Sequence, residues 1–168
     1  FSDDPDLVDP KSPTADGPLP ALVSLKSEAD ELALVAGLAR RAGAKQTVAV
    51  LFRDREAEAG LEAHIPSGMT RLHGDLRDWP SGNGIFYGTY HAAKGLEFDM
   101  VLLPFVSAAR LPHPPDVSTF GFDDVAAKDS ALLYVAITRA KSNLVLTHSG
   151  PVTSLLPTGA SLYQRSSR

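Results

Sequence analysis

The chain has 168 residues, 43% of them hydrophobic and 21% charged, with no cysteine and a formal net charge of −4 at pH 7. This length and composition suit one globular domain, and the lack of cysteine excludes disulfides, thiolate metal sites and thiol chemistry. The negative net charge excludes a protein that is basic throughout, so nucleic-acid binding would need a local basic groove. Because no apolar run approaches the roughly 18 residues that span a membrane, we expect a cytoplasmic protein with no membrane partner.

The first part of the chain predicts a linker, a strand and a helix. Residues 1–20 hold five of the 13 prolines, and a polar, proline-rich segment of this kind is typical of an extended linker. Residues 21–26 favour a short edge strand. Ser27 has the position of a helix N-cap with Asp30 as its partner three residues later, and Gly43 is placed to end this helix at C′.

The next segments alternate between strand and helix. Residues 47–52 form an unbroken apolar run rich in β-branched side chains, which predicts a strand buried on both faces. A short helix is predicted for residues 54–64 and a short strand for residues 69–72. The segment 66–84 is rich in proline and glycine, which favours loop structure around that strand.

The second half of the chain continues the same alternation. Strands are predicted for residues 85–89 and 99–106, and a loop for residues 107–122. Residues 123–141, which begin with an aspartate suited to a cap, predict a long helix with a broad apolar face. Residues 143–148 predict a final strand.

The sequence therefore predicts a linker over residues 1–20, one domain over residues 21–150 and a Ser-rich tail over residues 151–168, with a helical turn at 152–156. The alternation of strands and helices predicts an α/β fold, with a mostly parallel sheet covered by helices on both faces. In such sheets ligands bind outside the carboxyl ends of the strands.

A polar cluster interrupts the apolar runs around residue 90, and each of its members has an ordinary structural explanation. Lys94 and Glu97 are spaced to form a surface ion pair on a helical turn. His91 can be satisfied by backbone groups, and Gly95 can be a turn glycine. None of these residues alone indicates a function.

In combination the cluster resembles a known motif. The run Thr89-Tyr-His-Ala-Ala-Lys-Gly-Leu-Glu-Phe-Asp99, followed by an apolar strand, is similar to motif V of the UvrD/Rep-like superfamily 1 helicases. The run Leu132-Leu-Tyr-Val-Ala-Ile-Thr-Arg-Ala-Lys141, followed by a strand, is similar to motif VI of the same family. The resemblance covers about residues 20–150, and it implies the second RecA-like (P-loop NTPase-like) domain of such a helicase.

The resemblance also implies roles for individual residues. ATP binds between two RecA-like domains in this family, and the motif VI arginine, matching Arg139, reaches the γ-phosphate as an arginine finger. Glu97 matches a glutamate that accepts a hydrogen bond from the ATP ribose, and Gly95 allows the backbone to approach closely beside it. An alternative for Arg139 is a helix-end arginine that complements the helix dipole.

Further positions match the nucleic-acid side of the family. Thr89 and His91 match motif V residues near single-stranded DNA, where a hydroxyl and an imidazole can meet backbone phosphates. Lys94 and Thr138 are secondary candidates within the two motifs. The resemblance thus implies single-stranded or duplex DNA as a partner.

Two parts of an ATPase site are missing from the sequence. No Gly-x4-Gly-Lys-[Ser/Thr] loop is present, so the domain lacks its own Walker A loop. No strand ends in the Asp-Glu pair that holds Mg²⁺, since Asp30-Glu31 falls inside a predicted helix. We therefore expect the C-terminal piece of a longer ATP-dependent DNA helicase, whose N-terminal RecA-like domain completes the site for ATP and Mg²⁺. The chain alone is expected to hydrolyse no ATP, and its exposed domain interface is expected to promote homodimers of the isolated piece.

Two departures from the family limit the comparison. Only residues 66–84 are available for the helical subdomain that larger members insert, which predicts a compact member. The acidic-basic run that often precedes motif VI is here Lys128-Asp129-Ser130. The alternative function is a non-catalytic, degenerate helicase-like module that binds nucleic acid or a partner protein, although intact Glu97 and Arg139 argue against degeneration.

Overall fold

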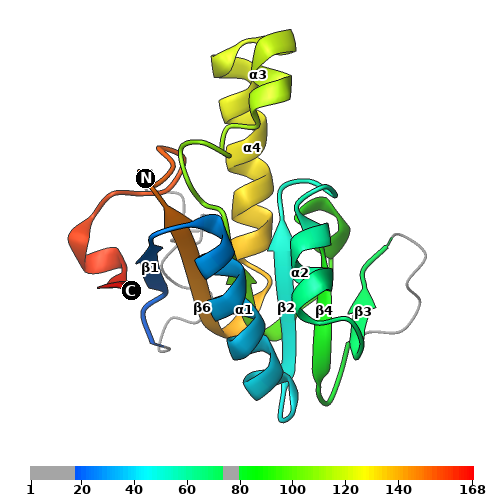
Figure 1. Cartoon of the computed structure of the whole chain (residues 1–168). Coiled ribbons are helices and arrows are strands. Elements are labelled where there is room, and N and C mark those ends of the chain that lie inside the picture. The colour runs from blue at the N-terminus through cyan, green and yellow to red at the C-terminus, as the bar shows by residue number, and fades with distance from the viewer. Residues whose placement is uncertain (1–17, 74–79) are drawn as a thin grey trace.

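The computed structural model describes residues 18–73 and 80–168, so most of the predicted linker lies outside the described residues. The described chain forms one seven-stranded sheet with strand order β3-β4-β2-β5-β6-β1-β7 (Figure 1). The strands are β1 (Ala21–Leu25), β2 (Thr47–Phe52), β3 (Met69–Arg71), β4 (Gly84–Thr89), β5 (Phe98–Leu103), β6 (Ala140–Ser149) and β7 (Gln164–Ser167). The helices are α1 (Glu28–Gly43), α2 (Glu58–His64), α3 (Pro114–Phe120) and α4 (Phe122–Ile137), with short 3₁₀ helices η1 (His91–Ala93) and η2 (Ala160–Leu162).

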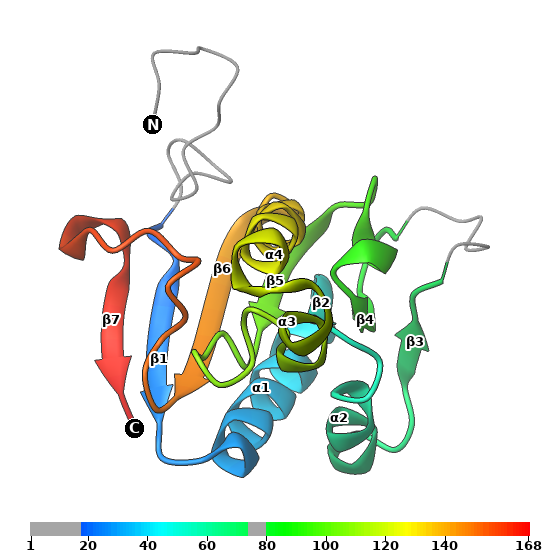
Figure 2. The same ribbon diagram turned by 90° about the horizontal axis from the view of Figure 1, so that it is seen from above.

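Helices cover both faces of this sheet, as predicted. The pairings between neighbouring strands are all parallel. Helices α1 and α2 lie on one face, and α4 and η1 lie on the other (Figure 2). No helix of the described residues has both the length and the apolar character needed to cross a membrane.

The central strand β2 shows why the sheet has two cores. All six of its residues are buried, which confirms the strand predicted from its apolar run. Alternate side chains of a strand point to opposite faces. Accordingly Val48 and Val50 pack with the core beneath α1 and α2, whereas Ala49 and Leu51 pack with the core beneath α4.

Helix α1 begins as predicted and ends differently. The backbone N–H of Asp30 donates to the Ser27 Oγ at 3.1 Å, which confirms the N-cap. Gly43 is the last helical residue instead of the C′ residue, and Ala44 ends the helix. A Cβ on Gly43 would lie only 2.6 Å from Ile85 Cγ1. The glycine therefore permits close packing of α1 on β4 rather than a left-handed helix end.

The segment before motif VI contains a helix that the sequence prediction missed. Residues 107–122 were expected to be loop, but Pro114–Phe120 form α3, with proline in the first turn. Proline suits that position because the first N–H groups of a helix have no partner inside it. Helix α4 ends at Ile137 instead of Lys141, since Ala140 already belongs to β6.

The C-terminal segment also differs from the expected tail. Strand β7 pairs in parallel with β1, so β1 is an interior strand and β6 is not the last one. Val152 forms an isolated antiparallel bridge with Ser107, and the turn expected at 152–156 is a single turn in which the N–H of Leu156 donates to the Thr153 carbonyl at 3.4 Å. The residues of β7 are all exposed. They show no hydrophobic alternation, which explains why this strand has no sequence signal.

Candidate functional site

The motif V-like segment is a short connection across one face of the sheet. Strands β4 and β5 both run parallel to β2, which lies between them. Residues 90–97 must therefore return from the carboxyl end of β4 to the amino end of β5. Parallel strands usually need a crossover of about a dozen residues or more. This connection is shorter, and it runs beside α4, against which η1 packs.

The start of the connection is held by hydrogen bonds to its flanking strands. The Thr89 Oγ1 accepts a hydrogen bond from the backbone N–H of Ala92 at 3.1 Å, and the N–H of Tyr90 donates to the Phe52 carbonyl at 2.8 Å. Tyr90 is fully buried, and burial, with the nearby Asp129 carboxylate, raises the pKa of its phenol. His91, the next residue, is exposed.

The end of the connection leaves Gly95 and Glu97 open to solvent. Gly95 has a φ of +84°, a conformation that favours glycine, and no atom lies within 4 Å of the place where its Cβ would be. Glu97 is exposed. Among the described residues, Lys94 and Glu97 form no ion pair, so the surface pair suggested by their spacing does not exist in this structure.

Arg139 joins this connection to the end of α4. Its Nη1 donates to the Leu96 carbonyl at 3.2 Å, and its Nε donates to the Val135 carbonyl at 3.0 Å. The backbone carbonyl of Arg139 accepts from the N–H of Phe98 at 2.9 Å. The contact with Val135 agrees with the helix-end role that the sequence left open, and the contact with Leu96 places the guanidinium one residue from Glu97 along the chain.

Thr138 lies between α4 and this guanidinium. Its Oγ1 is 3.0 Å from the carbonyl oxygens of Tyr134 and Val135, to which the hydroxyl can donate, and it accepts from Arg139 Nη2 at 3.1 Å. Three of the five N–H groups of Arg139 are thus engaged. Thr138 helps to fix the direction in which the guanidinium points.

The candidate residues lie at opposite ends of the parallel strands, which are called here the carboxyl edge and the amino edge of the sheet. Thr89 and His91 lie at the carboxyl end of β4. Glu97 and Arg139 precede β5 and β6 and so lie at the amino ends of those strands. The candidates Gly95, Glu97 and Arg139 therefore do not lie at the carboxyl ends of the strands, where the sequence predicted that ligands bind. Their motifs come before strands and not after them.

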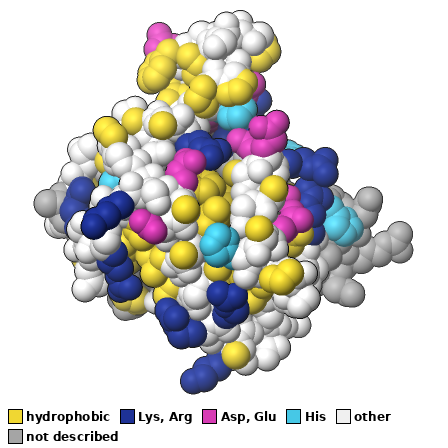
Figure 3. Space-filling view, in the orientation of Figure 1, with side chains coloured by type: hydrophobic (Ala, Val, Ile, Leu, Met, Phe, Trp, Pro, Cys, Tyr) yellow, Lys and Arg dark blue, Asp and Glu magenta, His cyan; other side chains and the backbone are white. Residues whose placement is uncertain are grey.

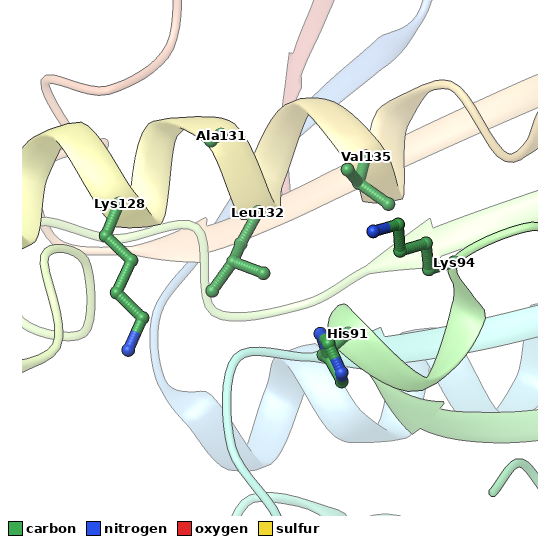
Figure 4. A pocket seen from close by; sticks show the side chains of 6 residues that line it. All are labelled: His91, Lys94, Lys128, Ala131, Leu132 and Val135. Carbon is green, nitrogen blue, oxygen red and sulfur yellow. The ribbon is translucent and has the colours of Figure 1, made fainter. Parts of the chain in front are cut away.

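A surface pocket lies between the connection and α4. Its volume is about 240 Å³. His91 and Lys94 come from the connection, and the other lining residues come from α4 (Figure 4): Lys128, Ala131, Leu132 and Val135. The sequence analysis did not place Lys128 in a site. The signal was available, because Lys128, Leu132 and Val135 recur at the spacing of one helix face.

Comparisons with known proteins bear on the family and the fold of this chain. Residues 70–150 match the model of the UvrD-like helicase C-terminal domain, a span that includes both motif-like segments. These residues are similar to a UvrD-like helicase C-terminal domain. The chain is 35% identical over 78 residues to an ATP-dependent DNA helicase PcrA of Staphylococcus aureus (strain MRSA252). The aligned residues make up 46% of this chain and 10% of that protein. A probable DNA helicase II homolog of Rickettsia conorii is 38% identical over 68 residues, which is 40% of this chain and 10% of that protein.

A solved structure supports the fold of this chain. The C-terminal domain of a possible DNA helicase from Lactobacillus plantarum WCFS1 superposes with a TM-score of 0.60, covering 89% of this chain and 86% of that one at 23% identity. This confirms the α/β fold predicted from the sequence. The chain spans about a tenth of the length of the curated relatives it matches.

At the carboxyl ends of the strands, the structure contains a charged network that sequence reasoning missed. Arg53 follows β2, and its Nε donates to the Asp129 Oδ1 at 2.8 Å, while its Nη2 donates to the Asp116 Oδ2 at 2.9 Å. Asp129 is fully buried and also accepts from the backbone N–H of His113. Asp129, which the sequence marked as a departure from the family, therefore ties α4 to β2 and to the start of α3.

No group of three or more histidine, aspartate or glutamate side chains suited to a metal ion occurs in residues 18–73 and 80–168. The candidate residues offer hydrogen-bonding groups and charge. Arg139 offers a fixed cation, Glu97 an exposed carboxylate, and Thr89 and His91 polar groups at the far end of the same connection.

Proposed function

We propose that this chain is the second RecA-like motor domain of an ATP-dependent superfamily 1 DNA helicase or translocase. The observation that carries the proposal is the direct bond between the two motif-like segments. The Arg139 Nη1 donates to the Leu96 carbonyl, beside Glu97. Two segments far apart in the sequence thus present a cation and a carboxylate at one edge of the sheet.

The residues at this edge fit a nucleotide. Two N–H groups of Arg139 remain beyond the three bonds described above. Arginine suits phosphate because its planar fork carries a permanent charge. Glu97 is exposed and can accept from a ribose hydroxyl, and the open space at Gly95 lets a ligand approach the backbone. A bound ATP would supply the phosphoanhydride whose hydrolysis powers movement.

The other half of the nucleotide site belongs, in this proposal, to a first RecA-like domain of the same protein. That domain would supply the phosphate loop and the Mg²⁺ ligands, for which this sequence contains no motif. Arg139 would act from this chain on phosphate held by the partner domain. Composite sites of this kind rely on positioning and on electrostatic stabilisation of phosphate charge.

The nucleic-acid contacts are proposed at the other end of the connection. Thr89 and His91 lie at the carboxyl end of β4, where the exposed imidazole of His91 can meet a phosphate of single-stranded DNA. The Thr89 hydroxyl already accepts from the Ala92 N–H, and its own proton is available to a ligand. The connection would thus link DNA contacts to nucleotide contacts through residues 90–97, which suits coupling of hydrolysis to movement.

The test is Arg139→Ala in the longer protein that we propose contains this chain. Arginine fingers contribute roughly 10³–10⁵ in rate, so ATP turnover should fall by at least about 10³-fold while ATP binding is largely retained. The control is Arg41→Ala, because Arg41 is an exposed arginine on α1, on the opposite face. A fall below about 10-fold for Arg139→Ala would contradict the arginine-finger role. Absence of ATP turnover in the unmodified protein would favour the non-catalytic, helicase-like binding module instead.

A further inference from the structure

The pocket between residues 90–97 and α4 has a cationic rim and an apolar wall. His91 and Lys94 border it from the connection, and Lys128 borders it from the helix (Figure 4). All three side chains are exposed. Leu132 and Val135 form the wall, on the same helix face as Lys128. No aspartate or glutamate lines the pocket.

The two lysines and the histidine of this pocket have no charged partner in the described part of the chain. No hydrogen bond or ion pair engages the side-chain nitrogens of His91, Lys94 or Lys128 there. Lys128 also borders a second hollow with Asp116 and Asp124, but Asp116 pairs with Arg53 and Lys128 forms an ion pair with neither carboxylate. Some other cations in this domain are paired, as Arg110 is with Glu28 and Arg53 is with Asp129. Unpaired cations around an apolar wall are suited to an anionic ligand with an apolar part.

We propose that Lys128 of α4 is a nucleic-acid contact, which holds a backbone phosphate of single-stranded DNA in this pocket together with Lys94 and His91. This inference rests on the proposed function, and it extends the proposed DNA site from the motif V-like connection to α4. The pocket of about 240 Å³ has room for a phosphate and part of its sugar, with Leu132 and Val135 against the apolar side of the nucleotide. Lys128 thereby places a DNA contact on the helix that ends beside Arg139.

The placement on α4 has a mechanical consequence. Lys128 and Val135 lie two turns apart on one face of the helix, and the Val135 carbonyl accepts from Arg139 Nε. A strand bound at Lys128 would therefore contact the same rigid helix whose end holds the proposed arginine finger. This gives a second route, besides residues 90–97, by which DNA and nucleotide can influence each other.

The test compares Lys128→Met with Lys45→Met in the 168-residue chain. Methionine keeps the apolar stem and removes the charge, and Lys45 is an exposed lysine in the turn between α1 and β2. Binding of an oligo(dT) strand is followed by fluorescence anisotropy over a range of salt concentrations. For Lys128→Met we expect affinity to fall by about 3- to 10-fold and the slope of log K against log salt to become less steep by about 0.7, the value for one lost phosphate contact with a single strand. Lys128→Arg should restore both, and Lys45→Met should change neither.

Two further arms separate this inference from the proposed function. His91→Ala removes a side chain of the proposed DNA site, so weaker binding of His91→Ala with unchanged binding of Lys128→Met would overturn only the role of Lys128. If the unmodified chain binds no oligo(dT), both proposals fail. If Lys128→Met weakens ATP or inorganic phosphate binding and leaves oligo(dT) binding intact, the pocket is a nucleotide or free-phosphate site and the proposal is wrong.

Discussion

At the scale of single residues, Asp99 joins the amino ends of β2 and β5, next to the candidate nucleotide-binding residue Glu97. Its Oδ2 accepts from the backbone N–H of Thr47 at 2.9 Å and from the Thr47 hydroxyl at 3.0 Å. These contacts join the start of β2 to β5, two residues after Glu97. Hydrogen bonds from Thr47, chiefly from its backbone N–H, lower the pKa of the Asp99 carboxyl, and Lys141 adds to this.

This lowered pKa predicts a loss of stability in acid. A carboxyl whose pKa is lower in the folded state stabilises the protein at pH values above its ordinary pKa, and the contribution is lost as the pH falls through the folded-state value. Asp99→Asn should therefore destabilise the chain at pH 7 by about 1 kcal/mol, with a smaller difference from wild type near pH 3. Urea unfolding at the two pH values measures this. Glu56→Gln, at an exposed position, serves as the control, and an Asp99→Asn effect that does not shrink in acid would contradict the assignment.

At the scale of elements, α1 contains two glycines with opposite surroundings. A Cβ on Gly43 would lie 2.6 Å from the Ile85 side chain. A Cβ on Gly37 would have its nearest neighbour at 3.4 Å, the end of the flexible Arg41 side chain. Packing therefore requires glycine at position 43, whereas Gly37 only lowers the stability of the helix.

Alanine substitutions at the two positions should therefore have opposite signs. Gly37→Ala should raise the free energy of unfolding by about 0.5–1 kcal/mol, since alanine is the better helix former. Gly43→Ala should lower it by about 1 kcal/mol or more, because overpacking costs about 1–3 kcal/mol and outweighs the helix gain. Thermal and urea unfolding of both variants provide the comparison. Stabilisation by Gly43→Ala would show that β4 can move away at little cost.

The same elements show how far the sequence can predict this domain. Strand β2 was predicted within its observed bounds because its apolar run is buried on both faces. Strand β7 was missed, since its residues are exposed and show no apolar alternation. A hydrophobic pattern in the sequence indicates burial, so it gives no signal for a strand whose residues are all exposed.

The candidate site was predictable in its membership and less so in its geometry. The motifs identified Glu97 and Arg139 and placed each ahead of a strand, although ligands were expected at the opposite, carboxyl ends of the strands. Spacing did not bring Lys128 to His91 across a pocket, because that contact depends on how α4 packs against the connection. The spacing of one helix face groups Lys128 with Leu132 and Val135, but it does not indicate which element that face meets.

At the scale of the whole molecule, the two ends of the fold present different surfaces. Helix α3 and the start of α4 project beyond the sheet (Figure 1), and hydrophobic side chains lie on this tip (Figure 3). Phe120 and Phe122 are the large aromatic side chains exposed there, at 65% and 53%. The amino edge instead carries Glu97 and Arg139. The proposed function assigns that edge to the interface with a first RecA-like domain.

The central claim is that this domain supplies one half of a composite ATP site. ATP hydrolysis by the 168-residue chain alone, compared with the longer protein that contains the first RecA-like domain, tests it most directly. We predict no turnover above background for the chain alone and DNA-stimulated turnover for the longer protein. Turnover by the chain alone at a rate similar to that of the longer protein would contradict the account.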